Sequence, residues 1–291
     1  MIRLIAIDID GTLLDSRGRL PEAHRDALAE AHRHGIAIAL VTGRSFHFAL
    51  PVVRSIGVPA ALVCNNGALV KDEDGETAMR RLLPRSAARS LLAATPGYED
   101  SVAIIFDRPD ERQMVFERMD WSHPNRSGYF EKNKAFIAKS AVPLADALTE
   151  DPIQVMFNGG VAAMRALIAS LRALPVAAEC AIAVTEYERR NFTLVDINGA
   201  GCSKGSTLAL WAERRGLARD HVMAIGDNLN DVEMLDFAGA AVVMGNSTDE
   251  LKQRGYLITA SNDEGGVAAA IRRYALNERP AGFQDSTSRL R

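Results

Sequence analysis

The sequence has few of the residues that mark specialised classes of protein. Its 291 residues include only three cysteines, Cys64, Cys180 and Cys202, which lie far apart and show no metal-binding spacing. Paired cysteines at regular spacing would indicate a secreted disulfide framework or a structural zinc site. We therefore expect reduced, buried thiols and a cytoplasmic protein.

Charge and hydropathy exclude two further classes. The net charge of −3 gives no electrostatic basis for binding nucleic acid or an anionic membrane. No apolar run is long enough to span a bilayer, and the first residues lack the pattern of a secretory signal. The six histidines show no ligand spacing, and we expect His24, His32 and His34 on the solvated face of a helix. We expect neither a nucleic-acid partner nor a membrane partner.

The pattern of elements changes twice along the chain. The first and last thirds alternate apolar strands with helices, and the predicted strands are 2–7, 36–41, 60–64, 192–197, 222–225 and 240–244. From about Pro84 the pattern becomes polar and mixed. We predict an α/β fold whose parts are a Rossmann-like parallel-sheet core at 1–83 and 188–278, an inserted α+β cap at 84–187, and a disordered tail at 279–291.

Two carboxylates follow the first predicted strand. Asp8 and Asp10 are two residues apart, so on extended chain they would share one face with Cα atoms roughly 7 Å apart. Gly11 then lets the chain turn sharply. Acids at the end of a buried strand are costly unless a cation is held there, and open α/β sheets bind their ligands at this edge.

A second acidic turn follows the predicted strand 222–225. It has the sequence GDNLND at 226–231, in which Asp227 and Asp231 form an i, i+4 pair. An acidic first helical turn is an equally common reading of this motif alone. With Asp8 and Asp10 at the same edge, four acids would repel by several kcal/mol unless a cation bridges them. Ligands that are all oxygen favour Mg²⁺.

Two weaker signals could hold a phosphate. Thr42, Gly43 and Arg44 offer a hydroxyl and backbone N–H groups at a predicted helix start, although a helix N-cap with an exposed arginine is the simpler reading. Ser203 is a candidate N-cap that places Lys204 in the first helical turn. A cation is unfavourable there unless it faces an anion, and a solvated lysine is the simpler reading of this residue alone.

Other patterns are ambiguous or fail. Asn66-Gly67 predicts a hairpin turn, at a strand end that points to the same edge. Gly199 and Gly201 match the first two glycines of a dinucleotide-binding GxGxxG motif, but the third position, 204, is lysine. No Walker A motif is present. In segment 107–133, two readings stay open. The segment contributes either to substrate recognition or only to a solvated surface, and its candidate residues are Arg112, Arg118, Trp121, His123 and Arg126.

In their order along the chain, these segments resemble the motifs of the haloacid dehalogenase superfamily of phosphohydrolases. The resemblance is to the Cof-like branch, which carries a large α/β cap. Residues 8–14 (DIDGTLL) are similar to the first motif, 42–44 (TGR) to the second, Lys204 to the third and 226–231 to the fourth. Asn66-Gly67 also fits a recurrent element of this branch. The similarity covers both core segments, whereas the cap matches only in position and approximate pattern.

The resemblance implies a role for each of these residues. Asp8 would be the nucleophile that forms an aspartyl-phosphate, and Asp10 the general acid and then the base. Thr42 and Lys204 would hold the phosphoryl oxygens. The substrate site would also include Gly43, Arg44, Asn66, Gly67 and Asn230. Mg²⁺ would be bound by the Asp8 side chain, the Asp10 backbone carbonyl and Asp227, with Asp231 close behind.

Three functions are compatible with these residues. The leading hypothesis is a Mg²⁺-dependent phosphatase of small phosphorylated metabolites, such as sugar phosphates or phosphorylated cofactors, acting as a monomer or homodimer. A phosphosugar mutase on the same fold is the first alternative, and it must return the phosphoryl group before water takes it. The second is a non-catalytic module that binds phosphorylated ligands. It ranks last because Asp8, Asp10, Lys204 and Asp227 are all present.

Overall fold

The computed structural model describes residues 1–109 and 112–277, so the tail predicted at 279–291 lies outside the described residues. The chain folds into two compact units. Of the described residues, the first unit holds 1–40, 51–61 and 209–277, and the second holds 41–50, 62–109 and 112–208. The second unit thus contains the predicted cap with flanking segments, and the cap boundaries at 84 and 187 stay a prediction.

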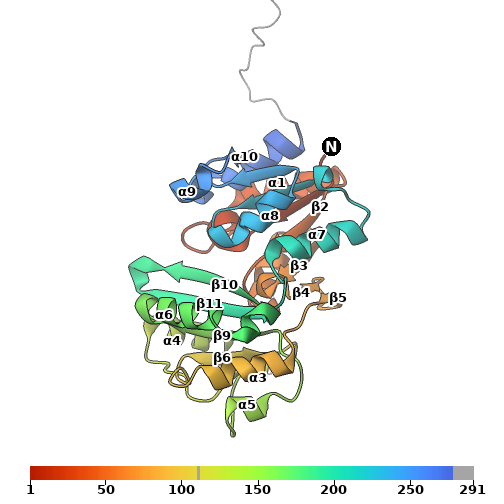
Figure 1. Cartoon of the computed structure of the whole chain (residues 1–291). Helices are drawn as coiled ribbons and strands as arrows, with labels where there is room; N and C mark the ends of the chain where they lie inside the picture. The colour runs from red at the N-terminus through yellow and green to blue at the C-terminus, as the bar shows by residue number, and fades with distance from the viewer. Residues whose placement is uncertain (110–111, 278–291) are drawn as a thin grey trace, which may run out of the picture. The chain divides into compact units, whose positions relative to one another are not determined.

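The first unit is built around parallel strands, which Figure 1 shows from red at the N-terminus to blue near the C-terminus. Their order is β14-β13-β12-β1-β2, and each neighbouring pair is parallel. The strands are β1 (Leu4–Ile7), β2 (Ala37–Val41), β12 (Val222–Gly226), β13 (Ala240–Val243) and β14 (Leu257–Ile258). Ile5, Ile7 and Ile225 have no exposed surface, as expected for parallel strands covered on both faces.

Helices of the first unit include α1 (Glu22–Arg33), α8 (Val232–Phe237), α9 (Asp249–Lys252) and α10 (Gly266–Ala270). α1 lies against α10. Its buried side carries Ala27, Leu28 and Ala31, and His24 lies on the same side because helical periodicity places it there. The prediction that His24 faces solvent is therefore wrong, whereas His32 and His34 are exposed as expected.

Antiparallel strands dominate the second unit. A hairpin of β3 (Ala60–Cys64) and β4 (Leu69–Lys71) continues into β5 (Thr77–Arg80), which confirms the turn predicted at Asn66-Gly67. A separate sheet has the order β10-β11-β9-β6-β7-β8, and only its β7/β8 pair is parallel. These strands are β6 (Val102–Ile105), β7 (Met114–Phe116), β8 (Ile137–Lys139), β9 (Gln154–Gly159), β10 (Cys180–Tyr187) and β11 (Phe192–Gly199).

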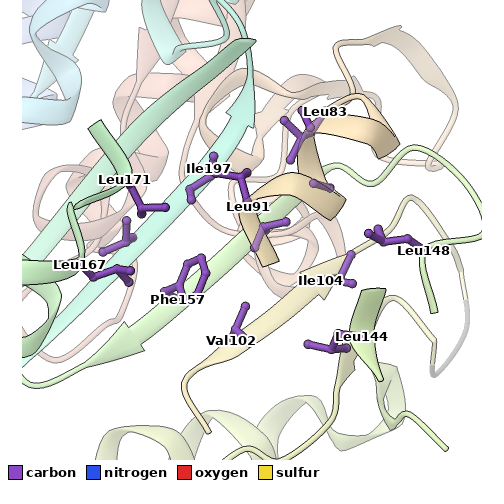
Figure 2. Close-up of a cluster of buried hydrophobic side chains, with 14 of the residues drawn as sticks. Leu83, Leu91, Val102, Ile104, Leu144, Leu148, Phe157, Leu167, Leu171 and Ile197 are labelled. Atoms are coloured by element: carbon purple, nitrogen blue, oxygen red, sulfur yellow. The ribbon is translucent and has the colours of Figure 1, made fainter. Parts of the chain in front are cut away.

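One apolar core holds the six-stranded sheet to its helices. Leu91 from α3 (Arg85–Ala94), Leu144 from α5 (Leu144–Ala147) and Leu171 from α6 (Val161–Arg172) pack in one cluster with Phe157 and Ile197 of the sheet (Figure 2). Alternate residues of the central strands β6, β9 and β11 face this core, and most of the residues between them, such as Ala103, Gln154 and Asn198, are also buried. The remaining helices, α2 (Phe46–Ser55), α4 (Pro124–Asn133) and α7 (Lys204–Arg214), complete the described set.

Segment 107–133, which had two open readings, forms β7 and α4. Arg126 is 7% exposed, and its guanidinium donates to the side chain and the backbone carbonyl of Asn158. Trp121 packs against Phe116 and Phe130 at ring-centroid distances of 5.1 and 4.7 Å. Arg126 and Trp121 therefore support the sheet. Among the described residues, no helix has the length and the apolar run needed to cross a bilayer.

Candidate active site

Three carboxylates of the first unit converge. One oxygen from each of Asp8, Asp227 and Asp231 lies within 4.8 Å of the others. Asp8 is 5% exposed and Asp231 is fully buried. Ionised carboxylates at this spacing and burial repel one another strongly unless a cation lies between them.

Strand register brings two of these acids together. Ile7, the last residue of β1, pairs with Ile225 of β12, and the Asp8 N–H donates to the Ile225 carbonyl (3.0 Å). Asp8 and Asp227 therefore leave neighbouring parallel strands at the same edge. The sequence predicted this edge because the carboxyl ends of parallel strands meet there.

A tight turn follows Asp8 and shapes the site. Residues Ile9–Leu13 form it, and Gly11 has a φ of +84°. A Cβ atom on Gly11 would overlap the Asp227 carboxylate, so glycine is needed here for both conformation and space. The Thr12 hydroxyl donates to Asp227 Oδ1 (2.8 Å), which ties the turn to β12.

Asp10 lies in this turn and is exposed, whereas Asp8 is buried. β1 ends at Ile7, so both acids lie beyond the strand and Asp10 lies in the turn that follows it; that the two side chains share one face stays a prediction. The ligand predicted from Asp10 is its backbone carbonyl oxygen, and that role stays a prediction.

Asp231 is held by the backbone of its own loop. Its Oδ2 accepts the N–H groups of Asp227 (3.0 Å) and Asn228 (3.1 Å), and the Asn228 side chain caps the turn through the Leu229 N–H. A Cβ atom on Gly226 would lie 2.7 Å from the Asp231 side chain. Asn230 is half-buried in the same turn.

The chemistry of this donor set fits a magnesium ion. The grouped ligands among the described residues are carboxylate oxygens, without a histidine or cysteine. Mg²⁺ prefers oxygen ligands and is commonly bound by one or two carboxylates, with substrate phosphate and water completing its shell.

The predicted phosphate-binding residues belong to the second unit. Thr42 is 1% exposed, and its Oγ1 accepts the Arg44 N–H (3.1 Å), which leaves the hydroxyl hydrogen to donate elsewhere. The Asn66 N–H donates to the Thr42 carbonyl (3.1 Å), and the Asn65 N–H donates to the Arg44 carbonyl (2.9 Å). The segment 42–44 is thus fixed by the turn that follows β3.

That turn also contacts the Lys204 region. Asn65, Asn66 and Gly67 all have positive φ angles, of 50°, 54° and 99°. The Thr207 hydroxyl donates to the Gly67 carbonyl (2.7 Å), and a Cβ atom on Gly67 would overlap the Ser203 backbone. The turn therefore connects the two segments that carry Thr42 and Lys204.

Lys204 is not a solvated lysine. It is 2% exposed and is the first residue of α7, after Ser203, whose hydroxyl accepts the Ser206 N–H (3.0 Å) and so forms the predicted N-cap. Burial and the helix dipole both disfavour an ammonium group at this position. A buried lysine here indicates an anionic partner.

Two further residues, Asp196 and Gln154, were not predicted from the sequence. Asp196 of β11 accepts a hydrogen bond from Asn66 Nδ2 (2.9 Å) on one oxygen and from Gln154 Nε2 (2.9 Å) on the other. Burial raises the pKa of Asp196 to about 7, although both hydrogen bonds act in the opposite direction. The available signal was that Asp196 is the one charged residue of the predicted strand 192–197.

Comparison with known proteins places the chain in a family. Residues 5–271 match the family described as haloacid dehalogenase-like hydrolase. The pyridoxal phosphate phosphatase YbhA of Escherichia coli (strain K12) is 28% identical over 284 residues, which cover 92% of this chain and 97% of that protein. The 5-amino-6-(5-phospho-D-ribitylamino)uracil phosphatase YcsE of Bacillus subtilis (strain 168) is 27% identical over 276 residues, covering 94% and 96%.

Solved structures agree with this assignment. The crystal structure of a haloacid dehalogenase-like hydrolase from Bacteroides thetaiotaomicron has a TM-score of 0.78 at 25% identity, and covers 94% of this chain and 99% of that one. The predicted fold class, the resemblance to Cof-like phosphatases and the predicted enzyme class are confirmed. The chain belongs to the haloacid dehalogenase-like hydrolase family, as a phosphoric monoester hydrolase.

Proposed function

We propose that this enzyme is a Mg²⁺-dependent phosphatase that works through an aspartyl-phosphate on Asp8. The observation that carries the proposal is the convergence of Asp8, Asp227 and Asp231 within 4.8 Å at the end of two parallel strands. A nucleophilic carboxylate that attacks a phosphate dianion needs neighbouring positive charge. A cation held between Asp8, Asp227 and Asp231 would provide that positive charge next to the proposed nucleophile, Asp8.

In the first step, Asp8 attacks phosphorus and the bond from phosphorus to the ester oxygen breaks. Asp10 gives its proton to that oxygen, so the alcohol leaves neutral. In the second step, Asp10 accepts a proton from water while the water oxygen attacks the aspartyl-phosphate. Inorganic phosphate leaves and Asp8 is restored. The exposed position of Asp10 lets both the leaving alcohol and water reach it.

Other residues hold the charged groups. The metal would be held by the Asp8 and Asp227 side chains and the Asp10 carbonyl oxygen, with Asp231 beside them, and when bound it neutralises the phosphoryl oxygens. Thr42 and Lys204 bind the phosphoryl oxygens through a hydroxyl and an ammonium group. We assign the rest of the substrate site to Gly43, Arg44, Asn66, Gly67 and Asn230.

For the substrate, we propose sugar phosphates or phosphorylated cofactors. Relatives named for pyridoxal phosphate and for a phosphorylated ribitylaminouracil support this class. We also propose a cytoplasmic location and a monomeric or homodimeric state, both of which stay predictions.

The test compares Asp8→Asn with Asp26→Asn, a substitution of the same chemistry at an exposed position of α1. Phosphate release from a panel of phosphate esters is measured with Mg²⁺, after chelation, and after Mg²⁺ is restored. We expect Asp8→Asn to lower kcat at least about 1,000-fold with its melting temperature kept, because a nucleophile acts only in the reaction. Asp26→Asn should match the wild type.

Two outcomes would overturn the proposal. One is an Asp8→Asn variant that keeps more than about a tenth of the activity. The other is conversion of a hexose 1-phosphate to the 6-phosphate without release of free phosphate, which would favour the mutase alternative.

A further inference from the structure

A buried cluster of amides surrounds one carboxylate in the second unit. Asp196 is 7% exposed, Asn66 4% and Gln154 3%. Asp196 Oδ2 accepts from Asn66 Nδ2 and its Oδ1 accepts from Gln154 Nε2, both at 2.9 Å. An ionised carboxylate can only accept hydrogen bonds, so both amides turn their NH₂ groups toward it.

The two amide oxygens have different surroundings. Gln154 Oε1 accepts a hydrogen bond from Asn65 Nδ2 (3.3 Å). Asn66 Oδ1 is buried and has no hydrogen-bond donor among the described residues. It lies beside Gly43, since a Cβ atom placed on Gly43 would be 3.1 Å from it. The Asn66 oxygen is therefore directed at the 42–44 segment, and Asp196 sets that direction.

We infer that Asp196 is a positioning residue for the reaction: its carboxylate fixes the amide of Asn66, and thereby the segment that carries Thr42. This inference rests on the proposed phosphatase function, in which Thr42 binds the phosphoryl group. The link is direct, because the Asn66 N–H donates to the Thr42 carbonyl and the Asn66 side chain faces Gly43.

Protonation of Asp196 would reverse one amide. The protonated carboxyl must donate its O–H, so one neighbouring amide must present an oxygen. Gln154 already uses its oxygen on Asn65, whereas the Asn66 oxygen is unpartnered, and Asn66 is therefore the side chain that turns. Its NH₂ group would then face Gly43, so the 42–44 segment would lie beside a hydrogen-bond donor in place of an acceptor.

Few titratable groups lie around this carboxylate. Its register partners are Met156 of β9 and Ala183 of β10, and its hydrogen-bond partners are Gln154 and Asn66; all four are uncharged. From α4, the Tyr129 hydroxyl interacts with Asp196 and shares a hydrogen bond with Ser45. Burial raises the pKa of Tyr129 to about 12, so it stays neutral while Asp196, with a pKa of about 7, titrates.

The decisive variant is Asp196→Asn, because its amide can donate to a turned Asn66 at every pH and so imitates the protonated state. The probe is p-nitrophenyl phosphate with Mg²⁺. We expect kcat/KM to fall at least about tenfold near pH 8, with an equal or higher melting temperature. The ratio of wild-type to variant kcat/KM should rise with pH through about 7. A purely structural role would instead lower activity and stability together, at every pH.

Two controls keep the result interpretable. Asp146→Asn makes the same change at an exposed position of α5 and should match the wild type at each pH. The proposed function is tested separately: it holds if the wild type is active and Asp8→Asn abolishes that activity, whatever the effect of Asp196→Asn. The inference about Asp196 is overturned if Asp196→Asn leaves kcat/KM unchanged near pH 8, or if the ratio of wild-type to variant kcat/KM is constant with pH. Neither result affects the proposed phosphatase function.

A second measurement decides the case in which Asp196→Asn folds poorly. The side-chain amide signal of Asn66 is followed by ¹H–¹⁵N NMR of the wild-type protein, and Asn66→Ser identifies that signal by its loss. A shift with a midpoint near pH 7 supports the inference, since the carboxylate beside the amide then changes charge. A signal that does not change between about pH 5 and pH 9 overturns it.

Discussion

Two buried aspartates, one in each unit, are held in opposite ways. Asp231 of the first unit accepts N–H groups from the backbone three and four positions earlier. Asp196 of the second accepts side-chain amides that are 130 and 42 positions away. A loop that closes on itself fixes the first acid, whereas the second depends on the assembly of several strands and a turn. Local loops are therefore readable from a sequence, and long-range networks are not.

The largest expected effect is a loss of stability in the six-stranded sheet, on which the hydrogen bonds of Asp196 depend. Phe157 has no exposed surface and lies on β9, the strand that carries Gln154. Phe157→Ala should lower the free energy of unfolding by about 3–5 kcal/mol, because a large cavity opens in the core. Urea unfolding measures it. Val142→Ala, at a position that is 47% exposed, serves as the control and should change stability by less than about 0.5 kcal/mol. A loss below about 1.5 kcal/mol for Phe157→Ala would contradict the role assigned to this core.

The pH dependence of stability should differ in sign between the units. The pKa of Asp196 is raised to about 7 in the folded state, so folded protein binds the proton more tightly than unfolded chain. Its contribution to stability should fall by on the order of 2–4 kcal/mol as pH rises from about 4 to about 7. Burial lowers the pKa of His24, so its contribution should fall as pH drops through about 6.5.

Chemical unfolding at several pH values measures both contributions. The stability difference between wild type and Asp196→Asn isolates the first, and the difference between wild type and His24→Asn isolates the second. Equal signs for the two differences would show that at least one of these groups is not buried in the way described.

The smallest effect concerns the loop beside the acid cluster. Gly11 and Gly18 both have left-handed φ angles, of 84° and 72°, but only the Gly11 position faces Asp227. Each change to alanine should cost about 1–2 kcal/mol of stability from backbone strain. Only Gly11→Ala should also lower kcat/KM, by about tenfold or more, because its methyl group displaces Asp227. Equal activities of the two variants would argue against the overlap.

The sequence predicted the parallel sheet and its acidic edge for a physical reason. Apolar strands followed directly by acids and glycine specify both the strand end and the turn, as at Asp8 and Asp227. It did not predict Asp196, because the amides that hold it come from another strand and from a turn. It also misplaced His24, since a histidine in a helix reads as polar unless its tertiary partner, the Leu13 carbonyl, is known.

Cys64 and Cys202 are buried as expected, whereas Cys180 is half-buried, so the prediction of a buried thiol is wrong for Cys180. Cys64 has no exposed surface, and burial raises its pKa to about 12, so its sulfur stays protonated and out of reach of electrophiles. Alkylation of this residue then requires the surrounding chain to open first. The rate at which iodoacetamide modifies Cys64 would therefore report the frequency of local unfolding around β3. Native protein should also resist air oxidation at this position.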